Sequence, residues 1–535
     1  MARTDSKGAD PLDWRARYER ERPRGSSLEV PAPKKGETPV YPTAYVTDRL
    51  LVSTLGDLDR ARELLDESAR EHGWRLEVDE SFEQVRLEPR PGEVEDRRRR
   101  HSWATGPLGL VRFVIVADRG AQTPDAWVVL QDARARATEQ GLELRGVGLD
   151  HIMTIDGGFT SSPYHSTPYH STPYHSTPYH STAGFDPSSG ATPMDAYLFQ
   201  GTGGRQPIAV VLPQPVRVKQ ENPVIVGTLD TGMGVHPWLA GLAPAAVGLP
   251  AIGRVDDTDD PELHPDLVGP LDGMTDVLSG HGTFIAGLIH QTAPDADIMP
   301  WRVVGPDGTI DESEVSAALA AIVDIVERAV AAPGSDGSLA LDVLSLSMGY
   351  YHETPEDYLV DITLAELLLR LRRAGTVVVC SAGNDGTSRP MFPAAFGPWD
   401  STPDSDVPWV DQSDAAPLIS VGARNPNGST ALFSNTGAWV QCYAEGASVV
   451  STAPASPGGS QPIARTIAYS RTRETIDPDD YSSGFAVWSG TSFAAPVIAG
   501  RVAAAIGLAG GAPTSAEDRV KRAISAAAGV VADAT

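Results

Sequence analysis

The chain has 535 residues, and a composition of 41% hydrophobic and 21% charged residues is that of a globular protein, which excludes a disordered or fibrous chain. A chain of this length exceeds one ordinary hydrophobic core, so two or more domains are expected. The net charge of −27 at pH 7 argues against nucleic acid or an anionic membrane as the main partner, because phosphate groups would repel the chain.

Two further features bear on cellular location. The N-terminus stays polar through Arg24, without the apolar stretch of a secretory signal, and no run of about 20 apolar residues predicts a membrane-spanning helix. Cys380 and Cys442 each lie in an apolar, strand-like run, and two buried free thiols are expected rather than a disulfide. The chain is therefore expected to be cytoplasmic.

The first part of the chain divides into two segments. Residues 1–40 are polar and rich in proline and glycine, and are interpreted as a tail, whereas residues 41–151 predict a small α+β domain. Two strand–helix–strand series follow one another in this domain: 49–52, 58–72 and 74–78, then 110–116, 126–140 and 142–147. Two such series favour a ferredoxin-like topology. The basic run Arg97–Arg100 is interpreted as a solvated turn rather than a docking patch.

Residues 152–205 are interpreted as a linker that contains a repeat. Tyr-His-Ser-Thr-Pro recurs with a five-residue step and places the imidazoles of His165, His170, His175 and His180 in identical frames. Proline at every fifth position excludes both a packed helix and strand pairing, so a semi-rigid spacer is favoured. Two alternatives stay open: transition-metal binding by the imidazoles, and a repeated substrate for a modifying or processing enzyme.

From residue 206 to 535, short apolar runs alternate with helical ones. The apolar runs are 224–229, 296–304, 341–348, 376–380 and 418–423, and the helical stretches include 312–331 and 358–374. Continuous apolar strands separated by helices predict a parallel sheet covered on both faces. The expected fold class is α/β, a doubly wound parallel sheet with a smaller N-terminal α+β domain.

Four polar residues lie where strands end or helices begin in this domain. Asp230 closes the apolar run 224–229, His281 lies between glycines before a helical stretch, and Ser492 opens the last apolar helix. Asn384 follows another apolar strand. A serine nucleophile needs a base, a group that orients the base, and donors for the oxyanion. These residue types supply all of them, although each alone is more often a turn or a helix cap.

Together, the motifs L-D-T-G, S-G-H-G-T, S-A-G-N-D-G and G-T-S-F-A-A-P resemble the subtilisin-like serine proteases, or subtilases, in this chain order. The resemblance covers roughly residues 220–510. It implies that Ser492 attacks the scissile carbonyl, that His281 carries the proton, and that Asp230 orients the imidazole. It also implies that the Ser492 amide and the Asn384 side chain hold the oxyanion.

The same resemblance places the substrate. Ser347, Met348 and Gly349 are expected to pair with the substrate backbone and to form one wall of the S1 pocket, with Ala382 and Gly383 opposite. The segment 303–308 resembles the lead-in to the strand on the other side of the peptide.

Three departures from the family pattern are visible. The loop that carries the tight calcium site of secreted subtilisins is missing after the His281 helix, so neither calcium nor any other cofactor is assigned. Acidic insertions at 256–276 and 396–415 are interpreted as solvated loops, with a rim that steers basic peptides as the alternative. The domain 41–151 has the size and element order of a prodomain, and stays open between an inhibitor or chaperone and a partner-recognition module.

The sequence thus predicts a serine endopeptidase that hydrolyses peptide bonds through an acyl-enzyme intermediate, inside the cell, with peptide or protein substrates. Intramolecular inhibition by residues 41–151, and regulation or maturation through that domain and the linker, are part of this hypothesis. The alternative is a latent or inactive protease fold that serves as a peptide-binding scaffold.

Overall fold

The computed structural model describes residues 25–28, 40–155, 205–209, 212–244, 248–268, 275–354, 362–399, 414–454, 465–510, 513 and 515–535. The Tyr-His repeat, most of the predicted tail and most of the second acidic insertion lie outside these residues. The predictions made for them are therefore not addressed by the structure.

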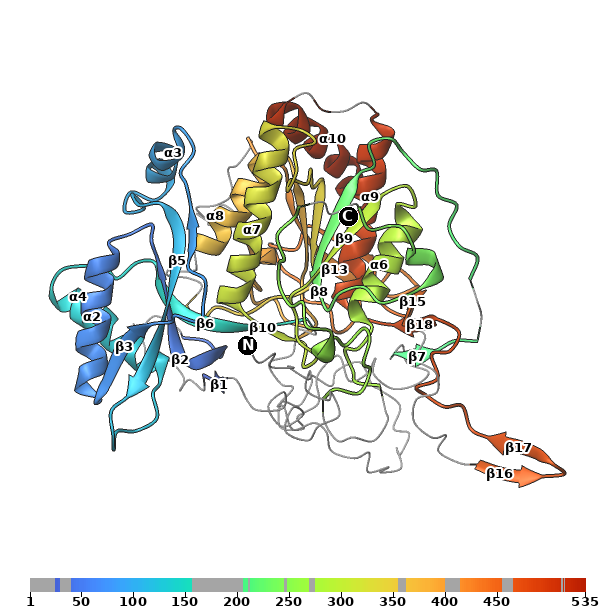
Figure 1. Cartoon of the computed structure of the whole chain (residues 1–535), viewed down its shortest axis with the longest axis horizontal. Helices are drawn as coiled ribbons and strands as arrows, with labels where there is room; N and C mark the ends of the chain where they lie inside the picture. Colours follow the sequence, from blue (N-terminus) through green and yellow to red (C-terminus); the bar gives the residue numbers. More distant parts are fainter. Residues whose placement is uncertain are drawn as a thin grey trace, which may run out of the picture.

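The N-terminal domain is a four-stranded antiparallel sheet with two helices on one face (Figure 1). Its elements are β2 (Ala44–Ser53), α2 (Leu58–Glu71), β3 (Trp74–Val78), β4 (Val85–Leu87), α3 (Glu93–Arg100), β5 (Leu108–Ala117), α4 (Ala126–Glu139) and β6 (Val147–Thr154). The order β6-β2-β5-β3 is the ferredoxin-like arrangement that the sequence favours, with β1 (Ser26–Ser27) added beside β2 and β4 beside β5. Asp57 and Asp125 cap α2 and α4 by accepting backbone amides of the first turn.

One predicted strand of this domain is displaced. The segment 142–147 was expected to be the last strand, but β6 spans Val147–Thr154, and Leu142 is 45% exposed. The strand therefore continues beyond residue 151, where the linker was expected to begin. Within 147–155 the odd-numbered side chains are buried, which is the alternation of a strand with one face covered.

The second domain is built on a six-stranded parallel sheet of order β14-β13-β12-β11-β8-β9, which confirms the doubly wound α/β class. Its strands are β8 (Ile225–Asp230), β9 (Asp297–Arg302), β11 (Val343–Leu346), β12 (Val377–Ser381), β13 (Leu418–Arg424) and β14 (Cys442–Glu445). Its helices are α6 (His281–Thr292), α7 (Glu312–Ala331), α8 (Ile362–Arg373), α9 (Thr491–Leu508) and α10 (Ala516–Ala534).

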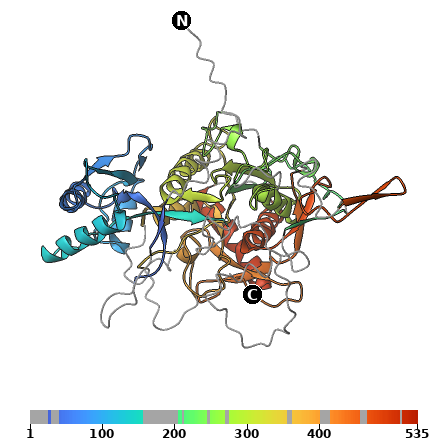
Figure 2. The same ribbon diagram turned by 90° about the horizontal axis from the view of Figure 1, so that it is seen from below.

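Alternate side chains of the strands enter two different cores. Val343 and Val377 pack with α6 and α9, whereas Leu344 and Val378 pack with α7 and α8 on the opposite face. Near the edges lie β10 (Thr309–Asp311) and a small sheet of β15 (Val449–Thr452), β18 (Phe485–Trp488) and β7 (Gln206–Pro207). The hairpin of β16 (Arg465–Ala468) and β17 (Arg471–Glu474) projects from the body of the molecule (Figures 1 and 2).

Two sequence predictions about apolar residues can be compared with this fold. Cys380 and Cys442 are both buried and free, as predicted. Among the described residues, α9 is long and apolar enough to cross a membrane by length and composition, but 72% of it is buried inside the protein. The apolar character of this helix is explained by its central place in the core.

The N-terminal sheet turns its second face to the protease-like domain. Leu51, Phe82 and Val85 of the N-terminal domain belong to the same apolar core as Leu319 of α7 and Leu367 of α8. Figure 1 shows α7 and α8 lying between the two sheets. Both helices thus cover a face of each sheet, and the two domains share a continuous apolar contact.

The basic run lies in this contact, so its interpretation as a solvated turn is wrong for two of its members. It forms the end of α3, in which Arg97 is completely buried and pairs with Glu93 at 2.6 Å and with Glu366 of α8 at 3.3 Å. Arg100 binds the same Glu366 carboxylate at 2.7 Å. Arg98 remains exposed. The partner carboxylate lies about 270 positions away in the sequence, where local charge patterning gives no sign of it.

Replacing Glu366 with alanine should therefore destabilise the docked N-terminal domain. The substitution leaves the buried Arg97 guanidinium without one of its carboxylates, and breaking a buried ion pair costs about 3–5 kcal/mol. Urea denaturation would measure this loss. The exposed Glu95→Ala substitution is the matched control and should change stability by less than about 0.5 kcal/mol. Equal losses in the two variants would contradict the prediction.

Candidate active site

The side chains predicted to act together come from four different elements of the parallel sheet domain. Asp230 is the last residue of β8, His281 the first of α6, Ser492 the second of α9, and Asn384 follows β12. Parallel strands end at the same edge of a sheet, which brings these segments together. All four residues are buried, with exposed fractions of 4% or less.

The Asp230 carboxylate holds the imidazole of His281. The distance between His281 Nδ1 and Asp230 Oδ1 is 2.8 Å, and the Thr231 amide donates to the same oxygen at 2.8 Å. A carboxylate bound to Nδ1 fixes the proton there and turns Nε2 into the basic nitrogen. The rings of Trp488 and Phe493 pack around the imidazole at 5.6 and 5.2 Å, so the pair lies in an apolar wall.

Asn384 is oriented by the start of α9. Its Oδ1 atom accepts the Thr491 amide at 2.9 Å and the Thr491 hydroxyl at 2.8 Å, which identifies Nδ2 as the donor end of the side chain. Ser492 lies in the first turn of α9, where backbone amides have no intrahelical acceptor. The Asn384 side chain is thus held at Thr491, the residue before Ser492, which brings its amide group and the Ser492 backbone amide to the same turn of α9, as an oxyanion site requires.

The residues predicted to bind substrate line the same region. The Ser347 hydroxyl donates to the Ser492 carbonyl oxygen at 3.0 Å, and Met348 beside it is buried. Gly383 donates its amide to Thr491 Oγ1 at 3.1 Å. A Cβ atom on Gly383, whose φ is +100°, would lie 2.5 Å from Asn435 Nδ2, so only glycine fits there. Asn435 in turn donates to the Ala382 carbonyl at 2.8 Å.

The sequence prediction missed the segment that lies between these walls. The end of β6 pairs antiparallel with β10, with Met153 opposite Ile310. On its other side, Thr154 exchanges two backbone hydrogen bonds of 3.0 Å with Gly349. The Ile155 amide donates to the Gly308 carbonyl at 3.2 Å. Residues 152–155 thus form a central strand between the two segments that were predicted to flank a peptide substrate.

This segment also reaches the predicted nucleophile. The Ser492 hydroxyl donates to the Ile155 carbonyl oxygen at 2.8 Å. Within the part of the chain that the structure describes, the Ser492 hydroxyl is hydrogen-bonded to Ile155 and not to His281. The alternating apolar side chains of Val147, Leu149 and Met153 were the sequence signal that could have extended the strand into this position.

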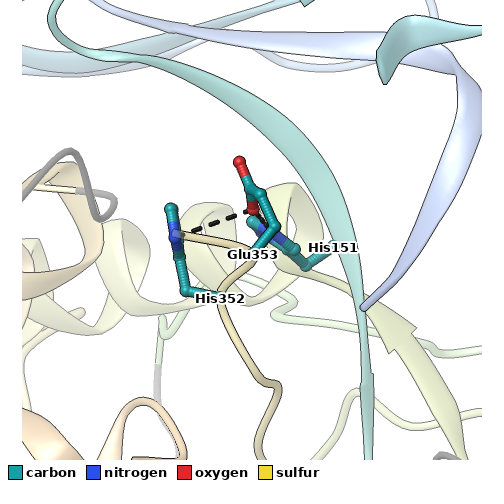
Figure 3. Close-up of side chains that lie close together, drawn as sticks. All are labelled: His151, His352 and Glu353. Atoms are coloured by element: carbon teal, nitrogen blue, oxygen red, sulfur yellow. Dashed lines mark hydrogen bonds and ion pairs between the residues drawn. The ribbon is translucent and has the colours of Figure 1, made fainter. Parts of the chain in front are cut away.

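A second group of buried ionisable residues lies where β6 enters the protease-like domain (Figure 3). His151 Nδ1 lies 2.6 Å from Glu312 of α7, and its Nε2 lies 2.9 Å from Glu353. Burial alone lowers the pKa of His151, but the two carboxylates outweigh it and raise that pKa to about 10. The His151 side chain is therefore a buried imidazolium at neutral pH.

His151, His352 and Glu353 present ligand atoms within 4.8 Å of one another, and were therefore tested as a metal site. His352 Nδ1 already accepts the Thr354 amide at 3.1 Å. The imidazolium proton occupies the space between His151 and Glu353. Burial lowers the pKa of His352 to about 3 and keeps it neutral, so the charges of the group balance without a metal ion. We assign no metal to it.

The described part of the first acidic insertion turns several of its carboxylates inward. Asp259 binds Arg302 at 2.7 Å, Asp276 accepts the Leu267 amide at 2.6 Å, and Glu262 is buried beneath Asp230 and His281. These three carboxylates therefore fit neither the predicted solvated loop nor the alternative of an exposed rim that steers basic peptides. Asp257 is exposed, as that interpretation expected.

Comparison with known proteins supports the resemblance noted in the sequence. The profile of the subtilase family matches residues 221–534. Over 251 residues the chain is 29% identical to Mycosin-4 of Mycobacterium tuberculosis, a match that covers 44% of this chain and 50% of that protein. It is 27% identical over 290 residues to an intracellular serine protease of Paenibacillus polymyxa, with 52% and 65% covered.

The matches leave part of each protein unaligned. The chain spans between half and two thirds of the length of these two relatives. Among solved structures, a cold adapted subtilisin-like serine proteinase matches 58% of this chain and 87% of its own, at 19% identity and a TM-score of 0.35.

The orientation of Asn384 leads to a prediction about turnover. Replacing Asn384 with alanine should lower kcat on a peptide substrate by about 10²–10³-fold with little change in KM, which is the known effect of removing such a donor in subtilisin itself. Steady-state kinetics would measure it. Asn427→Ala, in an exposed turn, serves as the control and should leave kcat unchanged. A wild-type kcat in Asn384→Ala would remove Asn384 from the oxyanion site.

Proposed function

Because the chain belongs to the subtilase family, we propose that it is a serine endopeptidase that hydrolyses peptide bonds through an acyl-enzyme intermediate. Ser492 attacks the scissile carbonyl, and His281 accepts its proton through Nε2 and later donates it to the leaving amine. Asp230 holds the imidazole by its Nδ1–H and stabilises the imidazolium. The bond between His281 and Asp230 supports these roles.

The substrate binds as an extended strand. A peptide that replaces residues 152–155 would pair with the carbonyl of Gly308 on one side and with both backbone groups of Gly349 on the other. This is recognition by strand addition, in which backbone pairing gives affinity and side-chain pockets give preference. Peptide and protein segments that can be drawn out into a strand are the substrate class that fits the cleft.

The N-terminal domain keeps this cleft filled, and we propose that it is an intramolecular inhibitor rather than a partner-recognition module. The observation that carries this proposal is the Ile155 carbonyl on the Ser492 hydroxyl, with the same chain paired on both edges. The segment runs in the position of a substrate, so self-cleavage at the Ile155–Asp156 bond or the bond after it would release the domain from the linker.

Buried charges hold the domain in place. Asp150 accepts the amide and the hydroxyl of Ser313 in the first turn of α7, where a carboxylate is favoured by the helix dipole. The next residue, His151, is the imidazolium bound by Glu312 and Glu353. Arg49 on β2 binds Asp311 at 2.6 Å. Arg49 also lies 3.7 Å from Asp150, whose pKa is raised to about 7 by burial and by the neighbouring Asp311.

The cellular setting belongs to the same proposal. We place the enzyme in the cytoplasm, on the free thiols and on the similarity to an intracellular serine protease. The repeat between the inhibitor and the protease domain is then a spacer whose length sets how easily the domain rebinds while the chain is still uncleaved.

The proposal is tested by the intact mass of the full-length protein before and after a fluorophosphonate probe, with Ser492→Ala as the control. We expect a wild-type chain cleaved within two peptide bonds after Ile155 and an adduct on the fragment that contains Ser492. The Ser492→Ala chain should stay whole and unlabelled, because it lacks the nucleophile. A wild-type chain that is neither cleaved nor labelled would favour the peptide-binding scaffold.

Removing the imidazolium should release the inhibitor. In His151→Ala, Glu312 and Glu353 lose the cation between them, and an unpaired buried charge costs about 3–5 kcal/mol. The rate of fluorophosphonate labelling of Ser492 should rise more than about tenfold. His72→Ala, at an exposed histidine of the same domain, should leave that rate unchanged. A labelling rate in His151→Ala equal to that of the control would show that His151 does not hold the inhibitor.

The raised pKa of His151 also predicts how the docking of the N-terminal domain changes with pH. The pKa of His151 is raised on folding, so its contribution to docking is fully present below the ordinary histidine pKa and is lost as the pH rises through about 10. The difference in labelling rate between wild type and His151→Ala should therefore shrink progressively as the pH rises above about 6.5 and disappear near pH 10.

A further inference from the structure

Glu262 comes from the insertion between the Asp230 and His281 motifs, yet its side chain lies under both of them. It is only 5% exposed, and it is separated in sequence from Asp230 by 32 positions and from His281 by 19. A carboxyl group in such a place must be held by donors or lose its charge.

Three donors hold it. Glu262 Oε1 accepts the Thr231 hydroxyl at 2.5 Å and the Gly282 amide at 3.1 Å, and Oε2 accepts the Thr283 hydroxyl at 2.5 Å. The Gly282 amide also donates to Thr231 Oγ1 at 2.8 Å. Thr231 directly follows Asp230, and Gly282 and Thr283 directly follow His281. One carboxyl group thus ties together the two segments whose side chains form the Asp230–His281 bond.

The charged groups around Glu262 come from β8, β9, α6 and its own loop. Asp230 faces it from β8 and Asp260 from its own loop, and both oppose its ionisation. Arg302 of β9 lies beside Asp260, at 3.6 Å, and His281 of α6 lies across the Thr231–Gly282 contact. Burial raises the pKa of Glu262 to about 7, in opposition to the Thr231 and Thr283 hydrogen bonds, which lower it. The group therefore gains its charge as the pH rises through neutrality.

We propose that Glu262 is a positioning residue of the catalytic apparatus, which holds Asp230 and His281 in register through Thr231, Gly282 and Thr283. Its carboxylate charge stabilises the imidazolium that His281 becomes during acylation. The inference rests on the catalytic roles proposed above. It adds a second buried carboxylate behind the Asp230–His281 pair.

This charge acts on the basicity of His281. A negative charge close to an imidazole favours its protonated form, so ionised Glu262 would favour the imidazolium of His281. Two effects of Glu262 can be measured separately. Its hydrogen bonds set the geometry of the Asp230–His281 pair, which governs kcat. Its charge sets the pH midpoint of the acidic limb of the kcat/KM profile. Removing a residue that is only structural would change kcat and leave that pH midpoint in place.

The experiment compares Glu262→Gln and Glu262→Asp in the full-length protein, with kcat/KM measured from pH 5 to 10 and corrected for the fraction that a fluorophosphonate labels. Glu262→Gln keeps an acceptor but has no charge, and should move the acidic midpoint down by about one pH unit. Glu262→Asp keeps the charge and should leave the midpoint within about 0.3 unit of wild type. Asp257→Asn removes an exposed charge of the same loop and is the control for a loop effect.

An acidic midpoint in Glu262→Gln equal to that of wild type, with a lower kcat alone, would overturn the proposal and leave Glu262 a purely structural residue. A shift of the same size in Asp257→Asn would overturn it as well, because the effect would then belong to the charge of the loop.

A second measurement needs no Glu262 variant and no turnover. In wild type and in Ser492→Ala, the carboxyl carbon of Glu262 should titrate near pH 7 in a ¹³C NMR experiment with labelled glutamate. A Glu262 carboxyl group that stays protonated up to pH 10 would overturn the proposal, because it would carry no charge to stabilise the imidazolium. A protein that shows the Glu262 titration but no hydrolysis would instead refute the proposed peptidase function, so the two failures are distinguishable.

Discussion

A single strand, β6, pairs with backbone segments of both domains, and the arrangement of the two domains depends on it. Its first residues pair with β2 inside the N-terminal domain, where Val52 lies opposite Val147. Its last residues pair with β10 and Gly349 at the edge of the other domain. Every buried backbone amide and carbonyl needs a partner, so a strand that leaves one sheet must find another. The cleft supplies that second edge, and the hydrogen-bonding requirement itself directs the chain to Ser492.

The ion pairs along β6 fix the register of the strand, whereas the apolar contacts beside them do not. Leu319 and Leu367 would accept many apolar surfaces, because hydrophobic contact is not directional. A buried imidazolium between Glu312 and Glu353 accepts one register only, since a shift of one residue would point His151 to the other face of the strand. Desolvation makes such pairs poor sources of stability. Their effect here is to place Ile155, four residues further on, at the nucleophile.

Local patterns were enough to predict much of this molecule. The helix at residues 312–331 was predicted to the residue, and the chain order of Asp230, His281 and Ser492 led to the family. The failures share one physical cause. Arg97, Glu262 and β6 each depend on partners far away in the sequence, namely Glu366, Thr283 and Gly349. A charge run or an acidic loop looks solvated in the sequence, because what makes it buried is the tertiary contact.

The inhibited and the working states proposed for this site would use the same atoms. Gly308 and Gly349 pair with residues 154 and 155 in the manner proposed for a substrate, so under the proposed inhibition an inhibitor and a substrate would differ in residence time rather than in binding mode. Residence time is set outside the cleft, by α7, α8 and the charges at the start of α7. A free peptide offers the cleft the same backbone but brings neither His151 nor Arg97. It can therefore bind, react and leave, while the tethered domain stays.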